Sequence, residues 1–147
     1  MRLARPLAGA LLATATTAGL LTGTASAAAA PASCSATARA CVDLSEGTAW
    51  LMDRGEVTYG PVEVTSGGQG HRTPTGTFAV TYKDIDHRSR AYDDAPMPYA
   101  VFFTTSGVAF HEGDRNSRSH GCVRLSPDAA AAFYEGLQPG DAVQVRR

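Results

Sequence analysis

Short runs in which apolar and polar residues alternate follow one another from about residue 48 to the end of the chain. Such alternation is typical of half-buried β-strands. The first two runs, 48–52 and 56–59, flank Asp53-Arg54-Gly55, whose residue types favour a hairpin turn. Further strands are predicted over 61–64, 77–82, 99–104, 108–111 and 142–145. Between them, composition predicts a loop over 66–70 and a charged loop over 83–94.

One helix is predicted near the C-terminal end of the chain. Ser126 is a good N-cap residue, Pro127 suits the first helical position, and Asp128 suits the positive end of the helix dipole. Gly136 is expected to end the helix. Many short strands with one principal helix, placed after Cys122, predict a mainly β domain.

The first residues of the chain have the three parts of a secretory signal peptide. Arg2 and Arg5 precede an apolar run over 7–21, and Ala25-Ser26-Ala27 is a small-residue cleavage site. A membrane anchor is the alternative, but the run is short and interrupted by Thr and Gly. We therefore expect a signal peptide over 1–27, an N-terminal tail over 28–40, and a secreted protein of the bacterial cell envelope.

Composition and charge narrow the class of protein. The chain has 147 residues, of which 44% are hydrophobic and 18% charged, with a formal net charge of −1. That length suits one domain with a targeting segment, and the ordinary apolar content excludes collagen, coiled coil and a mostly disordered chain. The near-neutral charge argues against nucleic-acid binding, which needs a cationic surface.

Three cysteines in an exported protein cannot all pair within the chain. A Cys34–Cys41 disulfide would close a small loop, contribute about 2.5 kcal/mol, and tie the tail to the domain. Cys122 is then left as a free thiol. Two alternatives are that it is a buried small apolar residue, or that it is bridged to one of the N-terminal cysteines.

Cys122 is a candidate nucleophile because histidines lie near it in the sequence. An unperturbed thiol is only about 3% thiolate at pH 7. A neighbouring imidazole and the N-terminus of the following helix are both expected to raise that fraction. His120 is two positions away, whereas His111 would approach from the preceding strand. The sequence does not choose between these two bases.

Two neighbours of Cys122 add to this chemistry. Gly121 allows a tight turn that could present successive backbone N–H groups to a developing oxyanion. Arg124 falls on the same side of an extended strand as Cys122 and could bind a carboxylate. By contrast, His71 and His87 fall in expected loops and are predicted to be solvated. The segment around Thr73 is compatible with a simple turn before a strand.

The segment 119–125, Ser-His-Gly-Cys-Val-Arg-Leu, resembles the signature of the L,D-transpeptidase (YkuD-type) catalytic domain, as does the strand ending in His111. Further matches follow in the family's order: Trp50-Leu51, Thr-Pro-Thr-Gly-Thr-Phe over 73–78, and Ala-Pro-Met-Pro-Tyr over 95–99. The resemblance covers about 41–145. It implies a YkuD-like β-sandwich or barrel-like catalytic domain over 41–147.

The resemblance also implies an activity. Cys122 would attack the carbonyl of the third residue of a peptidoglycan stem tetrapeptide, release the terminal D-alanine, and form a thioester. An amine of a neighbouring stem would resolve the thioester into a 3→3 cross-link. His111 would be the base, and backbone groups of His120, Gly121 and Cys122 would form the oxyanion site, with His120 also positioning the loop. The stem contacts would come from Arg124, Tyr99 and Ser119.

The same resemblance implies no cofactor or metal, and carbapenem β-lactams as covalent inhibitors. Two features depart from many family members: Cys122 follows His111 by only eleven positions, and Glu112 intervenes before Gly113.

Three alternative functions stay open. Water could resolve the thioester, as in an L,D-carboxypeptidase. His111, His120 and Cys122 could bind zinc in a hydrolase. A non-catalytic wall-binding module would leave Cys122 inert or paired.

Overall fold

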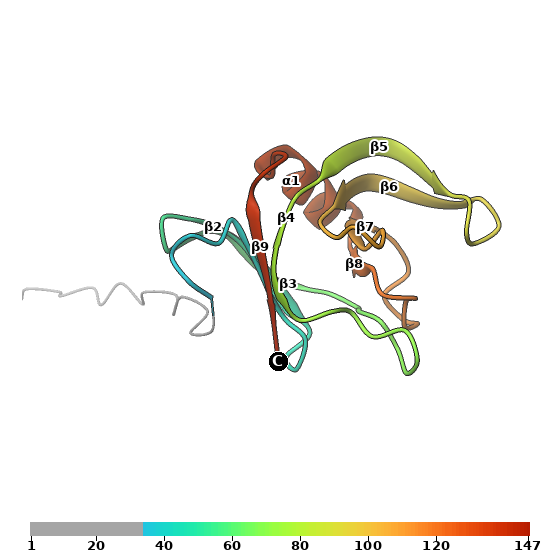
Figure 1. Cartoon of the computed structure of the whole chain (residues 1–147), viewed down its shortest axis with the longest axis horizontal. Helices are drawn as coiled ribbons and strands as arrows, with labels where there is room; N and C mark the ends of the chain where they lie inside the picture. Colours follow the sequence, from blue (N-terminus) through green and yellow to red (C-terminus); the bar gives the residue numbers. More distant parts are fainter. Residues whose placement is uncertain (1–33) are drawn as a thin grey trace, which may run out of the picture.

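The computed structural model describes residues 34–147, so the expected signal peptide lies outside the described part of the chain. Two sheets stand side by side, with the single helix of the described region where they meet (Figure 1). This is the mainly β fold that the sequence predicts. The larger sheet has the order β3-β2-β1-β9-β4. Its strands are β1 Ala40–Asp43, β2 Thr48–Asp53, β3 Glu56–Glu63, β4 Gly76–Ala79 and β9 Ala142–Arg146.

The smaller sheet carries the candidate chemistry. Its order is β5-β6-β7-β8, with β5 Tyr82–Ser89, β6 Ala95–Phe102, β7 Ala109–Glu112 and β8 Val123–Leu125. β7 and β8 pair in parallel, with His111 opposite Arg124. Because Cys122 comes directly before β8, this parallel pairing brings the cysteine and His111 to neighbouring strands.

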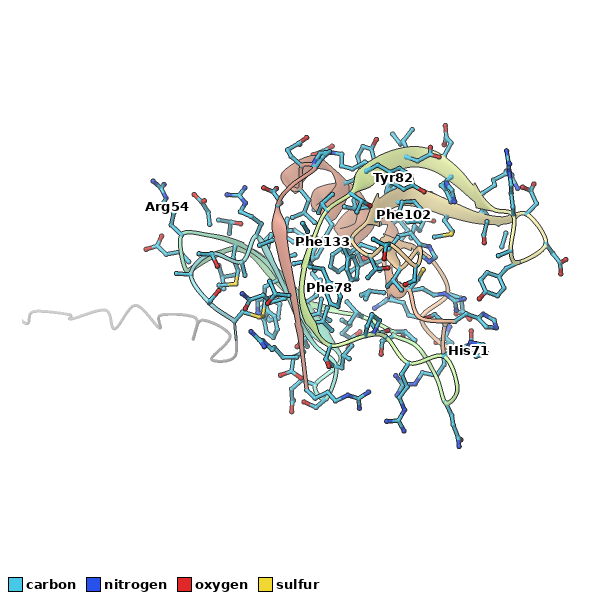
Figure 2. The ribbon with its side chains drawn as sticks, in the orientation of Figure 1. Arg54, His71, Phe78, Tyr82, Phe102 and Phe133 are labelled. Carbon is cyan, nitrogen blue, oxygen red and sulfur yellow. A yellow bond between two sulfur atoms is a disulfide. The ribbon has the colours of Figure 1, made fainter. Side chains whose placement is uncertain are left out.

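The core is built mainly from aromatic and branched side chains of both sheets and α1, which spans Pro127–Gly136. Phe110 is fully buried, with its ring centroid 4.8 Å from that of Phe103 and 5.0 Å from that of Phe133. Phe133 and Phe78 lie in the interior between the two sheets (Figure 2). Packing of α1 on this cluster holds β7 and β8 in place beneath the helix.

The predicted helix is confirmed, including both of its ends. The Ser126 hydroxyl accepts a hydrogen bond from the Ala129 amide at 3.3 Å. At the other end, the Lys83 ammonium donates to the carbonyls of Tyr134, at 2.6 Å, and Leu137, at 2.8 Å. Lys83 also lies 4.4 Å above the Tyr134 ring. A cation from β5 therefore satisfies the negative end of the helix dipole.

The predicted charged loop over 83–94 is wrong, because most of it forms β5, which pairs antiparallel with β6. The predicted strand over 77–82 is also divided, between β4 and β5. One reason is that the alternation of buried and exposed side chains is interrupted in β6, the strand that pairs with β5. Tyr99, inside β6, has a φ of +57°, and as a result Met97 and Ala100, three positions apart, pack in the same cluster. A period-two pattern cannot reveal such a strand.

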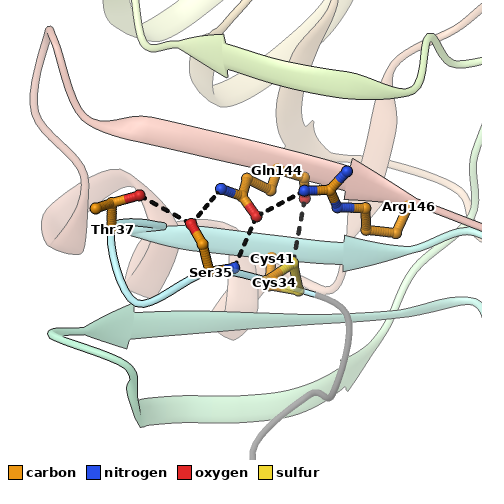
Figure 3. Close-up of a disulfide and its surroundings, with 6 residues drawn as sticks. All are labelled: Cys34, Ser35, Thr37, Cys41, Gln144 and Arg146. Carbon is orange, nitrogen blue, oxygen red and sulfur yellow. Dashed lines mark hydrogen bonds between the residues drawn. A yellow bond between two sulfur atoms is a disulfide. The ribbon is translucent and has the colours of Figure 1, made fainter.

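The predicted Cys34–Cys41 disulfide is confirmed, with a Cα–Cα distance of 6.0 Å (Figure 3). Buried Gln144 on β9 fixes the same segment, because its Oε1 accepts from the Ser35 amide at 2.9 Å and its Nε2 donates to the Ser35 hydroxyl at 2.6 Å. The disulfide and these bonds tie the tail to the larger sheet.

Within residues 34–147, no helix has the length and apolar character needed to cross a bilayer.

Candidate active site

A cavity of about 710 Å³ lies against the smaller sheet. Five residues singled out in the sequence line it: His111, Ser119, His120, Cys122 and Arg124. Other lining residues include Tyr82, His87 and Tyr92, which the sequence did not assign to a site, and Met97 from the segment 95–99 that resembles the family. The structure thus joins the segment around Cys122 to the β5–β6 hairpin, which projects to the right in Figure 1.

Cys122 is a free, half-buried thiol at the floor of this cavity. Its Sγ lies 3.9 Å from the Gly107 carbonyl oxygen, and its side chain packs against the small buried cluster that includes Met97 and Phe102. Burial raises the pKa of the thiol, and the opposing effects of the Ala109 amide and the Arg124 charge are smaller. The expectation of an increased thiolate fraction is therefore wrong for the resting protein, because loss of water outweighs the nearby positive charge.

His111 on β7 is the buried imidazole of the cavity, with 6% of its surface exposed. Its Nδ1–H donates to the Glu112 carbonyl at 2.6 Å, which leaves Nε2 free to take a proton. Burial is the main cause that lowers the pKa of His111, and the charges of Arg124 and His87 lower it further. Cys122 and His111 therefore rest as a neutral thiol and a neutral imidazole.

Two buried hydroxyls hold the nucleophile loop, which we define as residues 119–122. Ser119 donates to the Cys122 carbonyl at 2.6 Å and accepts from the Gly121 amide at 3.1 Å. Thr73 donates to the Gly121 carbonyl at 2.7 Å and accepts from the Gly67 amide at 2.9 Å. Ser119 thus positions the loop, and the stem contact expected of it stays a prediction. Thr73 is more than a turn residue, since it buttresses the loop.

These bonds also correct the expected oxyanion site. The Gly121 N–H is already bonded to the Ser119 hydroxyl, so it is not free to receive an oxyanion. Glycine is required at position 121 for another reason, a φ of +126°. The Cys122 amide makes no hydrogen bond within the described residues, and it remains the candidate donor.

Arg124 lies close to His111 because Gly113 leaves room for it. A Cβ at Gly113 would come within 3.0 Å of the Arg124 stem and 3.2 Å of the His111 ring. The guanidinium donates to the carbonyls of Asp114 and Ser117, each at 3.3 Å. Gly113, one position later than in many family members, thus allows this close packing. Arg124 also braces the short 113–117 loop.

Tyr99 is not among the residues that line the cavity, and its contact with the stem stays a prediction. Its ring packs against Tyr134 of α1, with centroids 5.9 Å apart, beside the main core. Two other tyrosines line the cavity instead. Tyr82 stacks on Phe102 at 4.3 Å, as their labels in Figure 2 show, and Tyr92 comes from the tip of the β5–β6 hairpin. The sequence could have indicated that Tyr82 and Tyr92 line the cavity only if β5 had been predicted as a strand.

His120 is exposed, and its ring contacts the rings of other side chains. Its ring stacks on Tyr92 at 4.4 Å and meets the edge of His71 at 4.7 Å. In the part of the chain from 34 to 147, no three His, Cys, Asp or Glu side chains are placed to hold a metal ion. Of the two candidate histidines, His111 is the buried one, with Nδ1 bonded and Nε2 free of any hydrogen-bond partner within the described residues, so we favour it as the base.

Comparison with known proteins agrees with this arrangement. A model of the YkuD L,D-transpeptidase catalytic domain family matches residues 37–145. L,D-transpeptidase 1 of Mycobacterium tuberculosis is 43% identical over 54 residues, which are 32% of this chain and 22% of that protein. The chain thus matches less than a quarter of that relative's length.

Solved structures show the same fold. The L,D-transpeptidase of Stackebrandtia nassauensis is 33% identical, with a TM-score of 0.69 over 74% of this chain and 54% of that one. The L,D-transpeptidase LdtMt1 in complex with imipenem is 27% identical, with a TM-score of 0.64 over 72% of this chain and 57% of that one. With the family match spanning most of the described residues, the chain belongs to the L,D-transpeptidase (YkuD) catalytic domain family.

Proposed function

We propose that this protein is an exported cysteine L,D-transpeptidase that acts on peptidoglycan stem peptides in the bacterial cell envelope. One observation carries the proposal: the free thiol of Cys122 and the imidazole of His111 share one cavity, and His111 keeps Nε2 free. Family membership supports the substrate class. The signal-peptide pattern over 1–27 supports export.

The first half-reaction follows from the resting state of the pair. As Sγ attacks the carbonyl of the third stem residue, Nε2 of His111 accepts the thiol proton, and a neutral pair becomes a thiolate and an imidazolium only at that moment. In this proposal the Cys122 amide, which makes no hydrogen bond within the described residues, stabilises the oxyanion. His111 then gives the proton to the departing nitrogen, so that D-alanine leaves and a thioester remains on Cys122.

The second half-reaction consumes the thioester. An amine of a neighbouring stem attacks it, a 3→3 amide bond forms, and the thiol is restored. Aromatic side chains around the cavity favour this outcome over hydrolysis because they exclude water from the acyl group. By the same chemistry, a carbapenem would acylate Cys122, in keeping with the imipenem complex of LdtMt1.

Incubation of the purified protein with a stem tetrapeptide tests the proposal. We expect release of D-alanine and formation of a cross-linked dimer. Cys122→Ala should abolish both, and His111→Ala should lower the rate by about 100-fold or more. Ser45→Ala, on the β1–β2 turn of the other sheet, is the matched control and should retain full activity. D-Alanine release by Cys122→Ala would refute the proposal, whereas release without dimer would identify a carboxypeptidase.

A further inference from the structure

His87 is a second imidazole in the cavity, and it has a carboxylate partner. It lies on β5, in the segment predicted to be a solvated loop. Its Nδ1 is 3.0 Å from Oδ2 of Asp84, and its ring packs edge-on against Phe102 at 4.8 Å. The side chain is 24% exposed and lines the cavity. With Nδ1–H committed to Asp84, Nε2 is the ring atom left for a ligand.

Two observations place His87 near the reacting groups. Across the hairpin it pairs with Met97, whose side chain packs in the same cluster as Cys122. Its side chain also lines the same cavity as those of His111 and Cys122. His87 therefore faces the space that an acceptor must enter to reach the thioester.

The second half-reaction needs a base that the first does not. An aliphatic amine with a pKa near that of lysine, about 10.4, is almost entirely an ammonium ion at pH 7. The balanced reaction of an ammonium with a thioester gives an amide, a thiol and one released proton. His111 passes one proton from the attacking amine to the departing thiolate. The other proton must leave the ammonium before its nitrogen can attack.

We propose that His87 accepts this first proton from the acceptor ammonium through Nε2. The nitrogen lone pair is thereby freed for attack, and the resulting imidazolium later loses its proton to water. Asp84 is the positioning residue: it holds Nδ1–H and stabilises the imidazolium. This inference rests on the proposed function, and it assigns His87 to the transfer step alone.

The two half-reactions can be separated experimentally with the His87→Gln variant. Acyl-enzyme is formed with a stem tetrapeptide, and its decay is followed by mass spectrometry in the presence of one of two acceptors. One is a second stem peptide, whose side-chain amine is protonated at pH 7, and the other is hydroxylamine, which is largely unprotonated. We expect His87→Gln to slow transfer to the stem peptide by about 100-fold and to leave the hydroxylamine rate within about twofold of wild type.

A matched pair of carboxylate variants tests the role of Asp84. Asp84→Asn should slow transfer to the stem peptide by about 10-fold. Asp86→Asn makes the same change two positions along β5, on a side chain that does not line the cavity, and should have no effect. Equal slowing of both acceptors by His87→Gln, or no slowing of either, would overturn the inference while the proposed function stands. Absence of any acyl-enzyme in the wild-type protein would overturn both.

Discussion

Burial acts on the thiol of Cys122 and the imidazole of His111 in the same sense, since it disfavours the charged form of each. The resting protein therefore carries little thiolate, and a small reagent meets a less reactive sulfur than it would on an unfolded chain. In the proposed mechanism, the thiolate forms only when substrate is in place and His111 accepts the proton. The Cys122 thiol can therefore be unreactive in the resting protein and still act as a nucleophile during the reaction.

Arg124 offers a test of this electrostatic balance. Its positive charge lowers the pKa of both His111 and Cys122, so Arg124→Gln should raise both. His111 would then be protonated at a higher pH on acidification, and the acidic limb of the acylation rate should move to higher pH. Arg124→Lys keeps the charge and should leave that limb in place, although it weakens the bonds to the 113–117 loop. A limb that is unmoved in Arg124→Gln, measured by acylation with imipenem, would contradict this interpretation.

Among the elements, β5 contributes both to the stability of the helix and to the candidate site. One of its side chains caps α1, three of its residues line the cavity, and the hairpin tip that follows it brings Tyr92 onto His120. The strand therefore links the stability of the helix to the shape of the site. With β1 and β8, it is also one of the strands that the sequence analysis failed to identify.

Replacement of Lys83 should show how much β5 contributes to stability. Lys83→Met removes two hydrogen bonds from a partly buried ammonium to the last carbonyls of α1, and we expect the free energy of unfolding to fall by about 2 kcal/mol. Urea titration measures it. Arg88→Met, on the same strand with a side chain that is 60% exposed, should change it by only about 0.5 kcal/mol. Similar losses in both variants would show that the helix cap contributes nothing.

The elements that the sequence predicts correctly are those governed by local rules. The helix has its cap at Ser126 and its end at Gly136, and the hairpin around Arg54-Gly55 has its turn residues in place. β5 follows no such rule. The Lys83 ammonium of β5 finds its hydrogen-bond acceptors on a helix about fifty positions later in the chain. The alternation of side chains along β5 is interrupted opposite Tyr99, whose left-handed backbone is rare for a bulky residue.

At the scale of the whole molecule, the site is assembled from distant parts of the chain. The sequence identifies Cys122, His111 and Arg124 because they lie within one segment with recognisable chemistry. It does not identify Thr73, which reaches the Gly121 carbonyl across 48 positions, or His87, whose place in the cavity depends on the β5–β6 hairpin. Such contacts follow from the tertiary arrangement and have no local signal.

The disulfide should stabilise the molecule without taking part in the chemistry. It belongs to the larger sheet, whereas the cavity is lined by the smaller one. The double variant Cys34→Ala/Cys41→Ala keeps Cys122 and should lose about 2.5 kcal/mol of unfolding free energy. Its acylation rate at 25 °C should equal that of wild type. Reduction of the wild-type protein should cause the same loss, and an unchanged urea midpoint after reduction would count against this role.

The most direct test of the whole account is the mass of the intact protein after brief exposure to a stem tetrapeptide. The account predicts an increase equal to the mass of the tetrapeptide minus the mass of D-alanine, located by peptide mapping on Cys122 and removed by an amine acceptor. An adduct on any other residue, or turnover with no mass increase at Cys122 even in a rapidly quenched sample, would contradict it.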